Sequence, residues 1–208
     1  MTLRLNGSTS GYTEIDAPAV AGSNTLVLPT GAGSAYQVVR NGATAGSLEF
    51  TDKIVSGTAV ASTSGTSIDF TGIPSWVKRV TVMFNGVSTN GTSNHQVQIG
   101  SGSVDATGYV STAAKCFNSA ANVTTSATGF IMTSGIGAAD LFYGAMTLSL
   151  LGSNIWSATF ATSMPVATGA AHFGGGTKTL SGTLDRVRIT TVNGTDTFDA
   201  GSINILYE

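Results

Sequence analysis

The chain has 208 residues, a formal net charge of −2 and 10% charged residues, whereas ordinary globular domains have roughly 25%. So weak a charge gives no bulk attraction to nucleic acid or to anionic lipid, which excludes nucleic-acid binding as the main role. The most apolar window, Phe130 to Leu151, contains Asp140 and several Gly, Ser and Thr residues, so we expect no insertion into a membrane.

The composition predicts strands and turns rather than helices. Gly alone contributes 27 residues, and Ser and Thr are similarly abundant. Thr favours strands, while Gly and Ser favour turns. No stretch has the apolar spacing of an amphipathic helix. Because Cys116 is the single cysteine, an internal disulfide is excluded, and stability has to come from burial or from assembly.

Residues 1–53 form the first predicted unit, a module of short strands. Five strand-like runs are each cut by Gly, Pro or Asn-Gly: TLRLNG, YTEIDAP, NTLVLPTG, AYQVVRNG and GSLEFTD. Runs this short bury too little apolar surface by themselves to offset the entropy lost on ordering. We therefore expect their apolar side chains to be buried against the same segment of neighbouring chains, or against another protein of the assembly.

Residues 54–208 form the second predicted unit, in which the strand-like runs are longer. The run SWVKRVTVMFNGVS places Val80, Val82 and Phe84 on one face. The run GAMTLSLLGSNIWSATFATSMPV predicts a hairpin that turns at Gly152-Ser153-Asn154. About eight such strands, with turn signals between them, predict a β-sandwich with a jelly-roll-like layout.

The end of the chain, with the runs LDRVRITTV, NGTDTFDAG and SINILYE, predicts a closing hairpin. In the first run Val187 and Ile189 alternate with Arg186 and Arg188, which is the period-2 pattern of a half-buried strand. Asn193-Gly194 supplies the turn, since both residues tolerate positive φ. We expect the two arginines to face solvent or a neighbouring subunit rather than to form an anion site.

A long interval of the chain is almost free of charge. Between Lys115 and Lys178 the only charged residue is Asp140. A soluble monomer usually keeps charges on every face. The interval therefore predicts that part of the surface is buried against copies of the same chain, with a neutral, hydroxyl-rich monomer surface as the alternative.

Catalytic and metal-binding patterns are absent from the sequence. His95 and His172 are far apart and no cysteine pair exists, so a zinc site has no support. Gly174-Gly175-Gly176 lacks the spacing of a phosphate-binding loop. Asp196 and Asp199 flank a turn, where Asp caps the backbone, and are not expected to converge as an acid pair. We expect no enzyme activity and no cofactor.

Aromatic side chains and polar loops are the remaining candidates for ligand binding. Trp76 and Trp156 could stack on a sugar ring, but both lie within strong strand patterns, which favours packing in the core. Loops on a rigid β-scaffold usually carry binding. The candidate loops are Ser88–Asn94, Asn118–Asn122 and Ala167–Lys178. The side chains predicted to contact a receptor are Asn90, Asn94, Asn118 and His172.

The opening RLNGSTSGYTEIDAPAVAGSNTLVLPTGAGSA, continued by NGATAGSLEF, resembles a short module of tail-fibre and other structural proteins of bacteriophages, notably those of cyanobacteria and marine bacteria. The block IDFTGIPSWVKRVTVMFNGVSTNGTSNHQVQIG and the ending LDRVRITTVNGTDTFDAGSINILYE resemble the C-terminal domain of the same proteins. The resemblance covers most of the chain and is least specific from about Ala113 to Ala145. It implies a homotrimeric virion component and no site residue.

Taken together, the sequence predicts an all-β protein with an N-terminal stem module at 1–53 and a jelly-roll-like β-sandwich knob at 54–208. The predicted function is a homotrimeric tail fibre or receptor-binding protein on the virion surface. Its partners would be other virion proteins, through residues 1–53, and a glycan or protein of the host surface. The chain lacks the long repetitive shaft of a long fibre, which leaves a capsid decoration protein as the alternative. A tailspike-type polysaccharide depolymerase is a further alternative, without an acid pair to support it.

Overall fold

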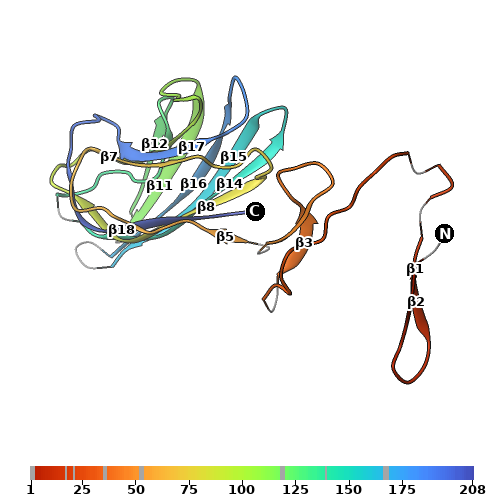
Figure 1. Cartoon of the computed structure of the whole chain (residues 1–208). Helices are drawn as coiled ribbons and strands as arrows, with labels where there is room; N and C mark the ends of the chain where they lie inside the picture. Colours follow the sequence, from red (N-terminus) through yellow and green to blue (C-terminus); the bar gives the residue numbers. More distant parts are fainter. Residues whose placement is uncertain are drawn as a thin grey trace. The chain divides into compact units, whose positions relative to one another are not determined.

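A computed structural model of the chain describes residues 3–16, 18–20, 22–34, 37–51, 54–117, 120–138, 140–165 and 169–208. The chain divides into two compact units, Met1–Lys53 and Ile54–Glu208. All regular structure in the described residues is β-strand (Figure 1), which confirms the predicted all-β class. The described residues hold no helix long and apolar enough to cross a membrane.

The first unit contains two separate hairpins. Strand β1 (Leu3–Asn6) pairs with β2 (Tyr12–Ile15), and β3 (Val38–Asn41) pairs with β4 (Leu48–Thr51). Four of the five predicted runs thus form strands, while the run around Val27 makes a single parallel bridge to β4's neighbour Ser47. Most apolar side chains of this unit are more than half exposed in the single chain, whereas Val38, Leu48 and Phe50 are partly buried. The exposed ones include Leu3, Leu5, Ile15, Leu26, Leu28 and Val39.

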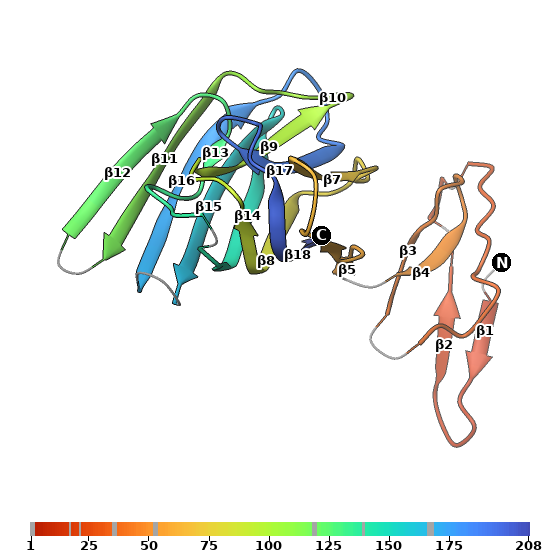
Figure 2. The ribbon, with the colours of Figure 1, turned by 90° about the vertical axis from the view of Figure 1, so that its left-hand side faces the viewer.

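The second unit is built on a large antiparallel sheet and a smaller one (Figure 2). The large sheet has the order β12-β11-β16-β15-β14-β8-β18-β5, and β6 also pairs with β18. Its strands are β5 (Val55–Ser56), β6 (Val60–Ala61), β8 (Arg79–Thr89), β11 (Tyr109–Phe117), β12 (Ala120–Ser126), β14 (Phe142–Gly152), β15 (Ile155–Met164), β16 (Ala170–Thr179) and β18 (Phe198–Tyr207).

The smaller sheet has the order β10-β9-β17-β7, with β13 paired to β9. Its strands are β7 (Ser67–Thr71), β9 (His95–Ser101), β10 (Ser103–Val104), β13 (Phe130–Ile131) and β17 (Arg186–Thr191).

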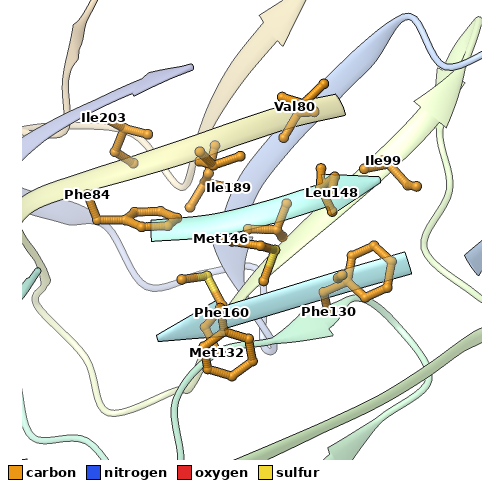
Figure 3. Packing of buried hydrophobic residues seen from close by; sticks show 14 of the residues in the cluster. Val80, Phe84, Ile99, Phe130, Met132, Met146, Leu148, Phe160, Ile189 and Ile203 are labelled. Atoms are coloured by element: carbon orange, nitrogen blue, oxygen red, sulfur yellow. The ribbon is translucent and has the colours of Figure 1, made fainter. Parts of the chain in front are cut away.

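One hydrophobic core is shared by the two sheets (Figure 3). The predicted inward positions of β8, Val80, Val82 and Phe84, are buried as expected. Because full burial of one large apolar side chain stabilises a fold by about 1.5–3 kcal/mol, this shared core stabilises the packing of the two sheets. Its members from the large sheet include Val80, Phe84, Met146, Leu148, Phe160 and Ile203, and those from the smaller sheet include Ile99, Phe130 and Ile189.

The predicted closing hairpin is wrong, because its two strands belong to different sheets. Strand β17 pairs with β7 and β9, whereas β18 pairs with β8, β5 and β6. Both strands bury one apolar face, including Ile189 and Ile203. Alternation predicts which face is buried but not which strand is the neighbour. The connection from Val192 to Thr197 crosses from one sheet to the other.

The predicted glycine loop at Ala167–Lys178 is also wrong where the structure describes it, because residues 170–179 form strand β16. This strand lies between β11 and β15. A Cβ atom at Gly175 would lie 2.3 Å from the backbone oxygen of Ala158, and one at Gly176 would lie 2.1 Å from that of Val110. The glycines therefore allow a close approach of neighbouring strands instead of marking a loop.

Candidate ligand-binding groove

Polar side chains form a regular ladder on the outer face of the smaller sheet. Its two rungs are Asp69–Arg188–Gln98 and Ser67–Thr190–Gln96, each running across β7, β17 and β9 in register. Because side chains alternate along a strand, these residues face away from the core in which Val187 and Ile189 are buried. Neighbouring strands are ~4.8 Å apart and the two rungs ~7 Å apart, so the ladder presents closely spaced polar groups.

The first rung contains a bidentate ion pair. Arg188 Nε donates to Asp69 Oδ1 at 2.6 Å, and Arg188 Nη2 donates to Asp69 Oδ2 at 2.9 Å. The hydrogen-bonded carboxylate raises the pKa of Arg188 above its usual value. Each side chain keeps over a third of its surface exposed. The pair fixes the guanidinium in place and cancels its charge at the ladder.

The two glutamines of the ladder are held by a loop that covers them. Gln98 Nε2 donates to the carbonyl oxygen of Thr128 at 2.9 Å, and the Thr128 hydroxyl donates to Gln96 Oε1 at 3.0 Å. A Cβ at Gly129 would lie 2.7 Å from Gln96 Oε1, so the loop lies directly against the amide. Both glutamines are buried and their side-chain orientation is fixed.

A groove of about 280 Å³ runs along this ladder. That volume is close to the lower end of the ~300–1,000 Å³ range of small-molecule sites. Hydroxyl and amide groups dominate the lining, and within the described residues it includes neither a carboxylate nor an aromatic ring. The lining consists of Thr66, Ser67, Gln96, Gln98, Ala106, Thr128, Arg188, Thr190, Thr191, Val192, Asn193 and Gly194.

One rim of the groove is a turn organised by Asn193. Its Oδ1 accepts hydrogen bonds from the backbone N–H groups of Thr195 and Asp196, and its Nδ2 donates to Asp196 Oδ1 at 2.6 Å. Asp196 Oδ2 accepts from the backbone N–H of Ser93 at 2.9 Å. The hydrogen bond from Asn193 lowers the pKa of Asp196, with that from Ser93 adding to the effect. Asp196 therefore stays ionised as a structural group of the turn.

The four predicted receptor contacts are placed very differently. Asn90 is exposed, but its Oδ1 accepts from the backbone N–H of Thr197 at 2.9 Å. Asn94 Oδ1 accepts from the backbone N–H of Gly135 at 3.0 Å. The Asn90 side chain thus braces the turn at the groove's rim, whereas the Asn94 side chain holds the segment around Gly135. Asn118 lies outside the described residues.

The predicted position of His172 in an exposed loop is wrong, because the residue is buried within strand β16. It pairs in register with Lys115 of β11, whose Nζ donates to the carbonyl oxygen of Gly135 at 2.5 Å. Burial lowers the pKa of His172, and the charge of Lys115 lowers it further. The glycine-rich sequence around His172 predicted a loop, whereas this segment forms a strand with a neighbouring strand on each side. No group of three or more potential metal ligands occurs among the residues that the structure describes.

The two tryptophans divide between core and surface. Trp156 is buried as predicted, but Trp76 is 39% exposed, so its predicted place in the core is wrong. Its ring lies 5.9 Å from that of Tyr207, centroid to centroid. Tyr207 also lines a smaller hollow of about 180 Å³ together with the ion pair of Arg79 and Glu208. This second hollow lies at the ends of β8 and β18 and has fewer amide and hydroxyl groups than the groove.

Gln96, Gln98 and Asp69 are site residues that the sequence analysis did not find. Each occupies the polar position of an alternating run, which is a visible signal. The run gives no register between strands, however, so the ladder could not be assembled from it. Comparisons with protein-family models, with curated protein sequences and with solved structures find no match to this chain.

Proposed function

We propose that the chain is a virion attachment protein, a homotrimeric tail fibre or receptor-binding protein that binds a neutral host-surface glycan non-covalently in the groove. In this proposal residues 54–208 are the knob, with a jelly-roll-like arrangement of strands, and residues 1–53 are the stem. The observation that carries the binding role is the polar ladder, whose side chains are oriented before any ligand arrives. The virion setting is supported by the sequence resemblance.

The chemistry of the ladder suits hydroxyl groups. Gln98 uses its Nε2 on Thr128, which leaves its Oε1 as an acceptor, and Arg188 uses Nε and Nη2 on Asp69, which leaves Nη1 as a donor. Neighbouring donors and acceptors on rigid planar groups can bind the adjacent hydroxyls of a sugar ring. Because Asp69 cancels the charge of Arg188, a neutral glycan is favoured over an acidic one.

Binding without hydrolysis is favoured by the composition of the groove. Glycoside cleavage uses two carboxyl groups on opposite sides of the scissile bond. Asp69 lies beside the groove but is held by Arg188, and no carboxylate is part of the described lining. A depolymerase activity therefore has no acid pair to use here.

Assembly is supported by the apolar side chains of the first unit. Leu26 and Leu28 are 65% and 70% exposed, and Ile15 is 59% exposed. Large exposed apolar side chains in a small unit indicate a surface that is buried in an assembly. Three weak binding sites carried by one trimer would raise the overall affinity for a repetitive glycan by ~10²–10⁴, which compensates for a shallow groove.

The test compares two arginine variants of the full chain, Arg188→Met and Arg186→Met. Arg188 lines the groove, while Arg186 lies two residues away on the same face and pairs with Asp185. We expect the labelled wild-type protein to bind host cells and neutral glycans on an array. Arg188→Met should weaken this binding at least about tenfold, and Arg186→Met should leave it unchanged. Equal binding by both variants, or binding that survives periodate oxidation of the cell surface, would argue against a glycan site in the groove.

A capsid decoration protein is the second candidate, because the same exposed apolar strands could lie on a coat lattice. Labelled antibody on intact particles separates the two roles. Label on the tail supports attachment, and label on the head supports decoration.

A further inference from the structure

The outer face of the large sheet carries no charged side chain across five neighbouring strands, β12, β11, β16, β15 and β14, all of whose residues the structure describes. The two lysines of these strands, Lys115 and Lys178, point inward and are buried. Asp140, which precedes β14, is buried as well. The charge-free interval of the sequence therefore folds into a charge-free surface, which we call the neutral face.

The outward side chains of the neutral face form rows in register. The central row is apolar and consists of Val123, Ala114, Phe173, Ala161 and Ala145. The next row consists of Thr125, Thr112, Gly175, Thr159 and Thr147. The central row thus crosses the sheet as an apolar stripe, and the threonine-rich row flanks it on one side. Val123 and Phe173 are 65% and 50% exposed in the single chain.

The size of the neutral face matches one side of a stable protein interface. Five strands ~4.8 Å apart, each with about four outward residues at ~6.8 Å spacing, cover ~650 Å². A standard interface buries ~800 Å² per partner, so the neutral face provides most of the area that one partner needs. The edge of the face is strand β12, whose residues 120–123 are exposed and contain neither a charge nor a proline. Edges of this kind lack the usual protection against pairing with another chain.

The neutral face also carries a protrusion beside a hollow. The exposed ring of Phe173 on β16 stands next to its register partner Ala161 on β15. Ala161 is one wall of a shallow hollow of about 340 Å³, which is also lined by Tyr143, Gly144, Thr162 and Ser163. A cavity of ~150 Å³ is enough to hold a benzene ring, so the hollow can receive one phenyl group. A surface that carries both the ring and its receptor is complementary to itself.

We infer that the neutral face is covered by a second copy of this chain, whose Phe173 ring enters the hollow over Gly144 and Ala161. A face that is complementary to itself joins two copies about a two-fold axis, so this contact is separate from the trimer of the proposed function and goes beyond it. The matching size, the lack of charge and the paired protrusion and hollow together favour a copy of the chain over an unrelated partner.

The test measures association of the full chain by analytical ultracentrifugation between micromolar and 100-fold higher concentrations. Thr159→Lys places a charge in the centre of the neutral face, and Thr63→Lys places the same charge in an exposed turn away from it. Phe173→Thr removes the protruding ring but keeps a strand-forming residue at that position. A cooperative melting transition followed by tryptophan fluorescence shows that a variant is folded.

We expect the wild type and Thr63→Lys to associate equally, and Thr159→Lys and Phe173→Thr to raise the dissociation constant at least tenfold. The thiol of Cys116, exposed on the same face of the single chain, should be alkylated faster in Thr159→Lys than in the wild type. A monomeric wild type, or folded face variants that associate normally, would overturn the inference. Glycan binding by a single subunit is measured separately, so a monomeric wild type would not contradict the proposed attachment function. Likewise, a loss of glycan binding in the groove would not contradict this inference about association.

Discussion

Replacement of the buried His95 by Phe should remove a large part of the acid sensitivity of residues 54–208. His95 begins strand β9, and its ring lies 4.5 Å from the Phe142 ring and 6.3 Å from the Phe198 ring. Neither ring nitrogen has a hydrogen-bond partner among the described residues. Burial lowers the pKa of His95 to about 3, although the charge of Asp196 opposes the shift. The folded protein therefore holds a neutral imidazole among aromatic rings.

The sign and size of the effect follow from proton binding. In the unfolded chain His95 titrates near its ordinary pKa of 6.5, so between pH 6.5 and pH 3 the unfolded state binds a proton that the folded state does not. Stability is fully present above pH 6.5 and is lost as the pH falls through this window. From pH 7 to pH 5 this single group costs about 2 kcal/mol, which is a large part of a typical stability of ~5–15 kcal/mol.

The assay is urea denaturation followed by tryptophan fluorescence at pH 7 and pH 5, at one protein concentration. We expect the wild type to lose about 2 kcal/mol more than His95→Phe between the two pH values. At pH 7 the variant should be as stable as the wild type or more stable, because an apolar ring replaces an unpaired polar one. His95→Leu serves as a second variant if the larger Phe strains the site. An equal pH dependence in all three proteins, or an imidazole NMR titration of His95 near 6.5, would refute the reasoning.

Three further outcomes follow from the packing. Gly175→Ala should destabilise the fold by about 1–3 kcal/mol because its Cβ would meet the backbone oxygen of Ala158 at 2.3 Å; thermal melting checks this against the exposed neighbour Thr177→Ala, and equal melting would contradict it. Tyr109→Phe should cost about 1–3 kcal/mol in urea denaturation, since the Tyr109 hydroxyl accepts from the buried backbone N–H of Ile99 at 2.8 Å; an unchanged midpoint would show that water replaces the hydroxyl. Deletion of Ser202–Glu208 should abolish cooperative unfolding of residues 54–208, because this segment pairs with β8 and buries Ile203 and Ile205; a soluble truncated chain with a sharp calorimetric transition would disprove it.

Local alternation was enough to predict the class of the fold and the buried side of several strands. Val80, Val82 and Phe84 are buried as the pattern indicated, and the hairpin of β14 and β15 turns at Ser153 and Asn154, which have positive φ. These features depend on neighbours in sequence, and a period of two residues reports them directly.

Features that depend on distant strands were not predictable in the same way. Strands β17 and β18 both alternate, but the choice of sheet depends on partners such as β7 and β8, which lie more than a hundred residues away. The three glycines of β16 indicated a loop, because a glycine run favours turns when its neighbours are unknown. The polar ladder combines residues from three strands, so its existence depends on register, which no single run contains.

The chain distributes its charge unequally between its two sheets, and this distribution links the groove to the neutral face. On the smaller sheet, Arg186 and Arg188 point outward and are paired with Asp185 and Asp69. On the large sheet, Lys178 points inward, where it pairs with Asp105 at 2.9 Å. The desolvation of a buried ion pair can cost as much as the pairing gains, so the inward orientation of Lys178 is difficult to explain by stability alone. It follows naturally if the outer face must remain neutral for association, while the paired charges on the opposite sheet orient donors toward a ligand. A charge added to the neutral face should therefore weaken association of the chains more than it weakens ligand binding in the groove.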